Sequence, residues 1–346
     1  MESDITIFYD RDYKRTCASI GWALISFIAV YNLLSILTLR FADTLDATLV
    51  YKWSYTLSEM IHIVIYLSSF LIPAFFLRFL LKRQGIFNRP SYSLSSTPSR
   101  SLLLIPGIIS VAMLVSAITS IVMAYFGVLE AYQSLVVFEG KYEGYQIVLL
   151  YISSALVPAF CEEFLFRGAI LANLMPYGKR GALIISAVLF GLMHENPYQI
   201  IYTTVAGLML GMAYIKTNSI WLPTLIHFCN NAYSCTCEVI YANVEPALAN
   251  GILIALRILL LLLGGVSIAL YMMRESKASA RRFDDGFFGR DIELDQSVSE
   301  KPISDGMAVK GFFRASTIIY IVATVLSMIM VFINLLIIAN SGAGMV

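Results

Sequence analysis

Three short polar clusters interrupt the apolar stretches of this 346-residue sequence. In each cluster, two residues are four positions apart, which places both on one face of a helix. Together they hold two carboxylates, two of only three histidines, an amide and a guanidinium. Such groups can activate water and stabilise a developing oxyanion. The spaced pairs are Glu163 and Arg167, Phe190 and His194, and His227 and Asn231, and Glu162 directly precedes the first pair.

The spacing of these clusters predicts that they meet. Glu162 lies sixteen residues before Gly178, and His194 lies sixteen residues after it. If both arms of this turn are helical, each residue is ~24 Å from the turn, at a rise of 1.5 Å per residue. His227 lies eleven residues beyond Lys216, which is about 17 Å by the same rise. We therefore expect one polar layer between the helices.

The residue types suggest a different chemical role for each polar group. Glu162 and Glu163 point about 100° apart on an α-helix, so they should have different partners. Arg167, one turn away, can hold Glu163 ionised, which leaves Glu162 to act as a general base on water. His194 can orient that water or donate a proton to a leaving amine. The third cluster supplies N–H donors for an oxyanion.

A metal site is the alternative for the same residues. Glu162, His194 and His227 would make a His₂Glu zinc set with an open water position. The His-Glu-x-x-His spacing of common metalloproteases is absent from the sequence. Glutamate-activated water explains the residues without a cofactor. The sequence therefore favours metal-free chemistry, with Zn²⁺ as the alternative.

The composition identifies an integral membrane protein. Hydrophobic residues make up 58% of the chain and charged residues only 14%, against about a quarter charged in soluble domains. The apolar residues form blocks of roughly 20, the length that crosses a ~30 Å hydrocarbon core. A soluble enzyme, a secreted disulfide scaffold and a disordered chain are excluded. The net charge of +1 gives no reason to expect a nucleic acid partner.

The apolar pattern predicts an all-α, polytopic transmembrane bundle of about eight or nine spans around an intramembrane catalytic cavity. The fifth and sixth elements are short and meet at residues 195–197, so their hairpin is expected to turn inside the membrane. The predicted elements are 18–39, 57–81, 101–126, 144–175, 182–195, 199–215, 219–241, 249–273 and 314–340.

Charge gives the orientation. If the spans alternate, 20 of the 24 Lys and Arg residues lie on one side and 3 on the other. The positive-inside rule then predicts a multi-pass cell-membrane protein with a cytoplasmic N-terminus. Of the other ionisable residues within spans, Glu59 and His62 are expected to be structural or interfacial. Glu238 and Arg257 are expected to neutralise each other.

The three ordered motifs, together with Gly207 and Gly211, resemble the CPBP family of CAAX prenyl proteases and bacteriocin-processing (Abi) intramembrane endopeptidases. The resemblance covers about residues 144–240. It implies a glutamate-dependent endopeptidase acting on membrane-associated proteins or peptides, prenylated or unmodified. By this resemblance, Glu162 and His194 activate water, His227 and Asn231 form the oxyanion site, and Glu163 and Arg167 support the first motif.

The chain then divides into three parts. Residues 1–143 form N-terminal transmembrane helices, and residues 144–245 form the CPBP-like catalytic core. Residues 246–346 form C-terminal transmembrane helices with a cytoplasmic loop at 274–313. The expected partners are the lipid bilayer and a protein or peptide substrate. Two other classes stay open: a proton-coupled transporter that uses the Glu and His residues as a relay, and a non-catalytic scaffold or bacteriocin immunity protein.

Overall fold

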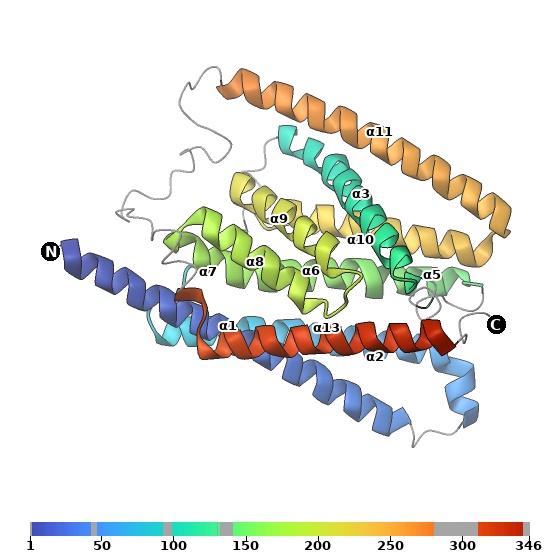
Figure 1. Cartoon of the computed structure of the whole chain (residues 1–346), viewed down its shortest axis with the longest axis horizontal. Helices are drawn as coiled ribbons and strands as arrows, with labels where there is room; N and C mark the ends of the chain where they lie inside the picture. The colour runs from blue at the N-terminus through green and yellow to red at the C-terminus, as the bar shows by residue number, and fades with distance from the viewer. Residues whose placement is uncertain are drawn as a thin grey trace.

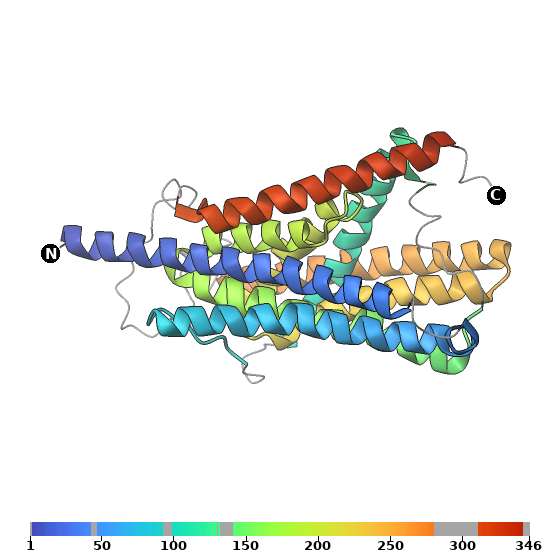
Figure 2. The ribbon, with the colours of Figure 1, turned by 90° about the horizontal axis from the view of Figure 1, so that it is seen from below.

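The computed structural model describes residues 2–42, 47–92, 99–129, 131, 141–279 and 311–341. Within these ranges all regular secondary structure is helical, as predicted. The long helices run roughly along one common axis, with α3 tilted across it (Figures 1 and 2). Seven helical segments are long and apolar enough to cross a membrane. The protein is a polytopic helical bundle. Most of the predicted loop at 274–313 lies outside the described residues.

Each of the nine predicted hydrophobic elements corresponds to helix. In chain order the helical segments are α1 (Glu2–Ala42), α2 (Ala47–Arg83), η1 (Ser99–Leu103), α3 (Leu104–Tyr125), α5 (Gly144–Leu150), η2 (Tyr151–Leu156), α6 (Val157–Glu163), η3 (Phe164–Leu171), α7 (Ala172–Leu174), η4 (Met175–Tyr177), α8 (Lys179–Met193), α9 (Ile200–Thr217), α10 (Trp221–Asn243), α11 (Pro246–Ser279) and α13 (Ala315–Ser341).

Two of the nine elements are not among the seven candidate spans. Helix α8 has only 15 residues, and α10 has 23 but carries the polar cluster around His227. Figure 1 shows the turn between α8 and α9 well inside the bundle, short of the end reached by α2 and α11. The turn thus lies between the ends of the longer helices, and its expected position within the membrane stays a prediction.

The helix that carries the first polar cluster is not a uniform α-helix. Segments η2 and η3 are π-helical, and α6 lies between them. Pro158 lacks an N–H group and cannot continue the hydrogen-bond ladder, which accounts for a wider turn directly before it. Single π-turns within helices often mark functional sites. Glu162 and Glu163 occupy the last two positions of the α-helical segment between the two π turns.

The two ends of the bundle differ in charge. Successive long helices run in alternating directions (Figure 1). The start of α1, the segment 84–92 and the turn at Gly178 therefore share one end, which we call the basic end because the sequence places most Lys and Arg residues there. The start of α2 and the connection between α10 and α11 lie at the opposite end.

Candidate active site

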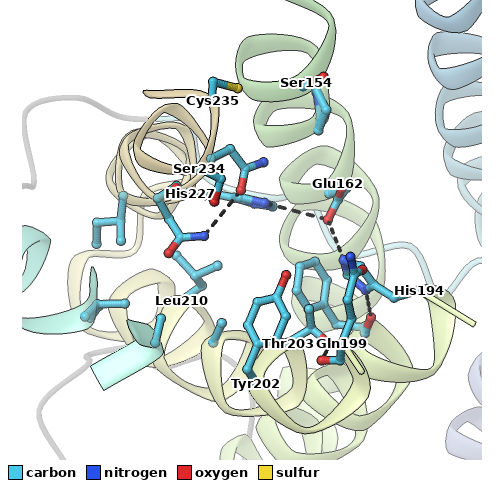
Figure 3. A pocket seen from close by; sticks show the side chains of 18 of the residues that line it. Ser154, Glu162, His194, Gln199, Tyr202, Thr203, Leu210, His227, Ser234 and Cys235 are labelled. Carbon is cyan, nitrogen blue, oxygen red and sulfur yellow. Dashed lines mark hydrogen bonds and ion pairs between the residues drawn. The ribbon is translucent and has the colours of Figure 1, made fainter. Parts of the chain in front are cut away.

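A cavity of about 350 Å³ lies between α2, α3, α6, α8, α9 and α10. It brings the three polar clusters together, as their spacing predicts. Glu162, His194, His227 and Asn231 all line it, and Phe190 forms part of its wall. Figure 3 shows Glu162 facing two imidazole rings. The His194 ring lies at the end of α8, and the His227 ring lies on α10.

The two oxygens of Glu162 have different surroundings. The carboxylate is buried, and its Oε1 accepts a hydrogen bond from the hydroxyl of Tyr66 on α2. Its Oε2 has no hydrogen-bond partner among the described residues. This atom is 4.0 Å from Nε2 of His194 and 3.8 Å from Nε2 of His227. One oxygen is therefore anchored, while the other faces two imidazoles.

Hydrogen bonds fix the orientation of both imidazoles. Nδ1 of His194 is 2.8 Å from the carbonyl oxygen of Phe190, and Nδ1 of His227 is 2.9 Å from Oε1 of Glu163. Both oxygens are acceptors, so each Nδ1 carries a proton. In the neutral imidazole Nε2 is then a lone-pair acceptor. Each ring turns its Nε2 toward Glu162.

A buried ion pair supports the site from behind the cavity wall. Glu163 is 0% exposed and Arg167 1%, and Nη1 of Arg167 donates to Oε1 of Glu163 at 2.8 Å. Nη2 donates to the carbonyl oxygen of Gly207 at 3.1 Å. The guanidinium also lies over the ring of Phe190, 4.5 Å from its centroid. The predicted contact between Glu163 and Arg167 is thus present.

The expectation that the two glutamates have different partners is confirmed for their hydrogen bonds, although one imidazole ring lies between them. His227 donates to Glu163 through Nδ1 and faces Glu162 with Nε2. An imidazole ring has nitrogens on two edges, so one ring from α10 can lie between two carboxylates that point in different directions. His227 therefore couples the buried ion pair to the cavity.

Phe190 and Gly207 act through packing. The Phe190 ring is 2% exposed and packs edge-on against both His194 and His227, with centroids 5.1 and 5.8 Å apart. A Cβ atom on Gly207 would be 3.1 Å from Cα of Ala187. The glycine thus lets α9 approach α8 closely and presents its carbonyl oxygen to the guanidinium.

Asn231 lies one turn beyond His227 on α10 and lines the same cavity. Its Oδ1 accepts a hydrogen bond from Nδ2 of Asn230 at 3.3 Å. This bond assigns the acceptor atom of the side chain, so that its Nδ2 group remains as a donor. The amide and the His227 ring can therefore act on one bound group from the same helix.

Sequence reasoning missed Tyr66, which lies on a helix far from the three motifs. A signal was present, because His62 and Tyr66 are four residues apart and share a helix face, as the motif pairs do. Their rings pack edge-on, with centroids 5.6 Å apart, and both line the cavity. His62, expected to be structural or interfacial, is thus part of the cavity wall.

The expected pair of Glu238 and Arg257 is also corrected. Within the described residues these side chains form no ion pair, and Glu238 accepts a hydrogen bond from the hydroxyl of Tyr142. Arg257 instead interacts with the hydroxyl of Tyr233 on α10. Glu238 points to the cavity, which it lines at the far end from Leu210.

The zinc alternative, with Glu162, His194 and His227 as ligands, stays a prediction. No group of three His, Cys, Asp or Glu side chains in the described part of the chain is placed to hold a metal ion. Ligands of a tetrahedral zinc ion lie about 3.4 Å apart, given bonds near 2.1 Å. Oε2 of Glu162 is 3.8 and 4.0 Å from the two imidazole nitrogens. We therefore derive no step through a metal.

Comparisons with known proteins match the segment that carries the motifs. Residues 144–233 match the family model described as type II CAAX prenyl endopeptidase Rce1-like. A Bacillus subtilis (strain 168) protein described as "Putative membrane peptidase YdiL" is 30% identical over 103 residues. That match covers 29% of this chain and 39% of the relative's length. No solved structure matches the chain.

Proposed function

We propose that this chain, whose residues 144–233 match the Rce1-like family model, is a CPBP-type intramembrane endopeptidase that hydrolyses peptide bonds of membrane-associated proteins or peptides. The observation that carries this proposal is Oε2 of Glu162, which is buried and unpartnered beside Nε2 of two imidazole rings. A buried carboxylate oxygen without a hydrogen-bond donor is costly, so the position favours a bound donor such as water.

In the proposed reaction, a water molecule lies between Oε2 of Glu162 and Nε2 of His194. It donates one hydrogen to each atom and directs an oxygen lone pair at the substrate carbonyl carbon. Tyr66 holds the other carboxylate oxygen and so limits rotation of the general base. As the new C–O bond forms, Glu162 takes the proton of the water.

The tetrahedral intermediate carries its negative charge on the former carbonyl oxygen. His227 donates to that oxygen when it enters the cycle with Nε2 protonated as well, because its Nδ1 proton is bound to Glu163; it keeps both protons throughout the cycle. The Glu163 carboxylate accepts hydrogen bonds from Nδ1 of this ring and from Nη1 of Arg167, which hold the ring in place. Nδ2 of Asn231 supplies a second donor, as in other oxyanion sites.

Collapse of the intermediate breaks the C–N bond. The proton held by Glu162 passes, directly or through His194, to the leaving nitrogen. The products are a peptide with a new carboxyl terminus and a peptide with a new amino terminus. One water molecule is consumed, and the enzyme returns to its starting protonation state.

The test is a comparison of peptides in membranes and medium of source cells that carry wild type, Glu162→Gln or Glu245→Gln at equal abundance. Glu245 caps the start of α11 through the N–H of Leu248, so its variant is a matched control. We expect a trimmed terminus or released peptide with wild type and Glu245→Gln only. Identical inventories in all three strains would contradict proteolysis and favour the transporter or scaffold classes.

A further inference from the structure

We propose that substrate enters the cavity from the end opposite the basic end, and therefore that this protein cleaves bonds presented from the extracytoplasmic side of the membrane. The substrate class rests on the proposed function. The direction of entry rests on the shape and lining of the cavity and on the charge of the two ends of the bundle, and it is tested separately.

The polarity of the lining changes along the cavity. On α10, lining residues from His227 toward Asn243 are Asn230, Asn231, Ser234, Cys235 and Glu238, and on α2 the residue beyond Tyr66 in the same direction is His62. Toward the basic end the lining residues are apolar: Ile108, Leu210 and Ile226. A peptide backbone and its water are better accommodated by the polar part.

Exposure follows the same direction. His62 and Ser234 line the cavity and are exposed. At the basic side, Ile226 is 0%, Leu210 3% and Ile108 5% exposed, and they pack with Ala213 and Leu222 in one buried cluster. This cluster forms an apolar floor beneath the reactive groups. The mouth of the cavity is therefore at the opposite end.

The segment 84–92 is held against the helices at the basic end by hydrogen bonds. Nδ2 of Asn88 donates to the carbonyl oxygen of Ala172, and its backbone N–H donates to Oδ1 of Asn173, both at 2.7 Å. Nε1 of Trp221 donates to the carbonyl oxygen of Tyr92 at 2.9 Å. These bonds fasten the segment to α7 and to the start of α10 at the basic end.

Charge then assigns the two ends to the two sides of the membrane. The positive-inside rule places the basic end in the cytoplasm, so the mouth faces the exterior. The matching substrates are translocated peptides and the outer ends of membrane-spanning proteins. A lipidated tail held at the cytoplasmic leaflet would meet the fastened segment instead.

The test is thiol labelling from each side of the membrane. The five native cysteines are replaced by alanine, and Ser234→Cys or His62→Cys is introduced at the mouth. Arg89→Cys, in the exposed part of the fastened segment, is the matched control. We expect a membrane-impermeant maleimide to modify both mouth variants in intact cells, and Arg89→Cys only in inverted vesicles. Modification of the mouth variants only in inverted vesicles would overturn the proposal.

Two additions keep the result decisive. If the cysteine-free chain does not accumulate, the same variants are labelled in the native background and compared with wild type. Each mouth variant is also combined with Glu162→Gln, which should leave the labelling unchanged because access does not require catalysis. Reversed labelling with Glu162-dependent cleavage would refute only the direction of entry. The expected labelling without cleavage would refute only the proposed function.

Discussion

Removal of the buried guanidinium is expected to destabilise the fold strongly. Arg167→Met eliminates the bonds to Glu163 and Gly207, at 2.8 and 3.1 Å, and leaves a carboxylate that is 0% exposed without its cation. Breaking a buried ion pair from one side costs about 3–5 kcal/mol. We expect the free energy of unfolding to fall by this amount.

The partner variant completes a double-mutant cycle. Glu163→Gln keeps an acceptor oxygen for Nδ1 of His227 but leaves the guanidinium unpaired, so a similar loss of about 3–5 kcal/mol is expected. The double variant has neither buried charge, so no charge is left without a partner. Its loss should therefore be smaller than the sum of the single losses by about 2 kcal/mol, within the range of measured couplings between contacting residues.

The assay is denaturant unfolding of the purified protein in detergent, followed by tryptophan fluorescence. Lys14→Met is the matched control, because Lys14 and Asp10 form an (i, i+4) pair whose side chains are 42% and 33% exposed. Such a surface pair contributes about 0–1 kcal/mol. If Arg167→Met cost no more than Lys14→Met, or if the cycle were strictly additive, the reasoning about the buried pair would be refuted.

Three further predictions concern turnover of a substrate identified in cells. Tyr66→Phe should lower kcat roughly 10- to 100-fold with little change in KM, since a hydrogen bond to a charged group contributes about 1.5–3 kcal/mol; an equal effect of Tyr31→Phe would point to general destabilisation. Asn231→Ala should lower kcat by about 10²–10³, as loss of one oxyanion donor does, whereas Asn250→Ala should not; a normal kcat would remove Asn231 from the oxyanion site. Dialysis against a chelator should leave kcat unchanged, and a loss restored by Zn²⁺ would contradict metal-free chemistry.

Much of the architecture follows from local sequence features. Each of the nine predicted apolar blocks lies on a helix, because a segment that crosses lipid must be apolar over its whole length whatever its neighbours are. The four-residue spacings predict which motif side chains share a face. Equal distances from Gly178 place Glu162 and His194 at one level, and both line the cavity.

Contacts between distant helices were harder to predict. Tyr66 meets Glu162 across 96 residues of chain, and nothing in the local pattern says which face of α2 turns toward α6. His227 lies between both glutamates because of the position of α10. Glu238 has Tyr142 as its partner rather than Arg257, because the packing of neighbouring helix ends places the tyrosine hydroxyl next to it. The π turns beside α6 also alter the side-chain register that a uniform α-helix would give.

The central claim is that Glu162 activates water to hydrolyse a peptide bond. The most direct measurement is cleavage of a substrate peptide by the purified, reconstituted protein in ¹⁸O-labelled water, with wild type and Glu162→Gln compared at equal folded concentration. Wild type should place ¹⁸O in the new carboxyl terminus, and Glu162→Gln should form no product. Cleavage by Glu162→Gln at the wild-type rate would contradict the account.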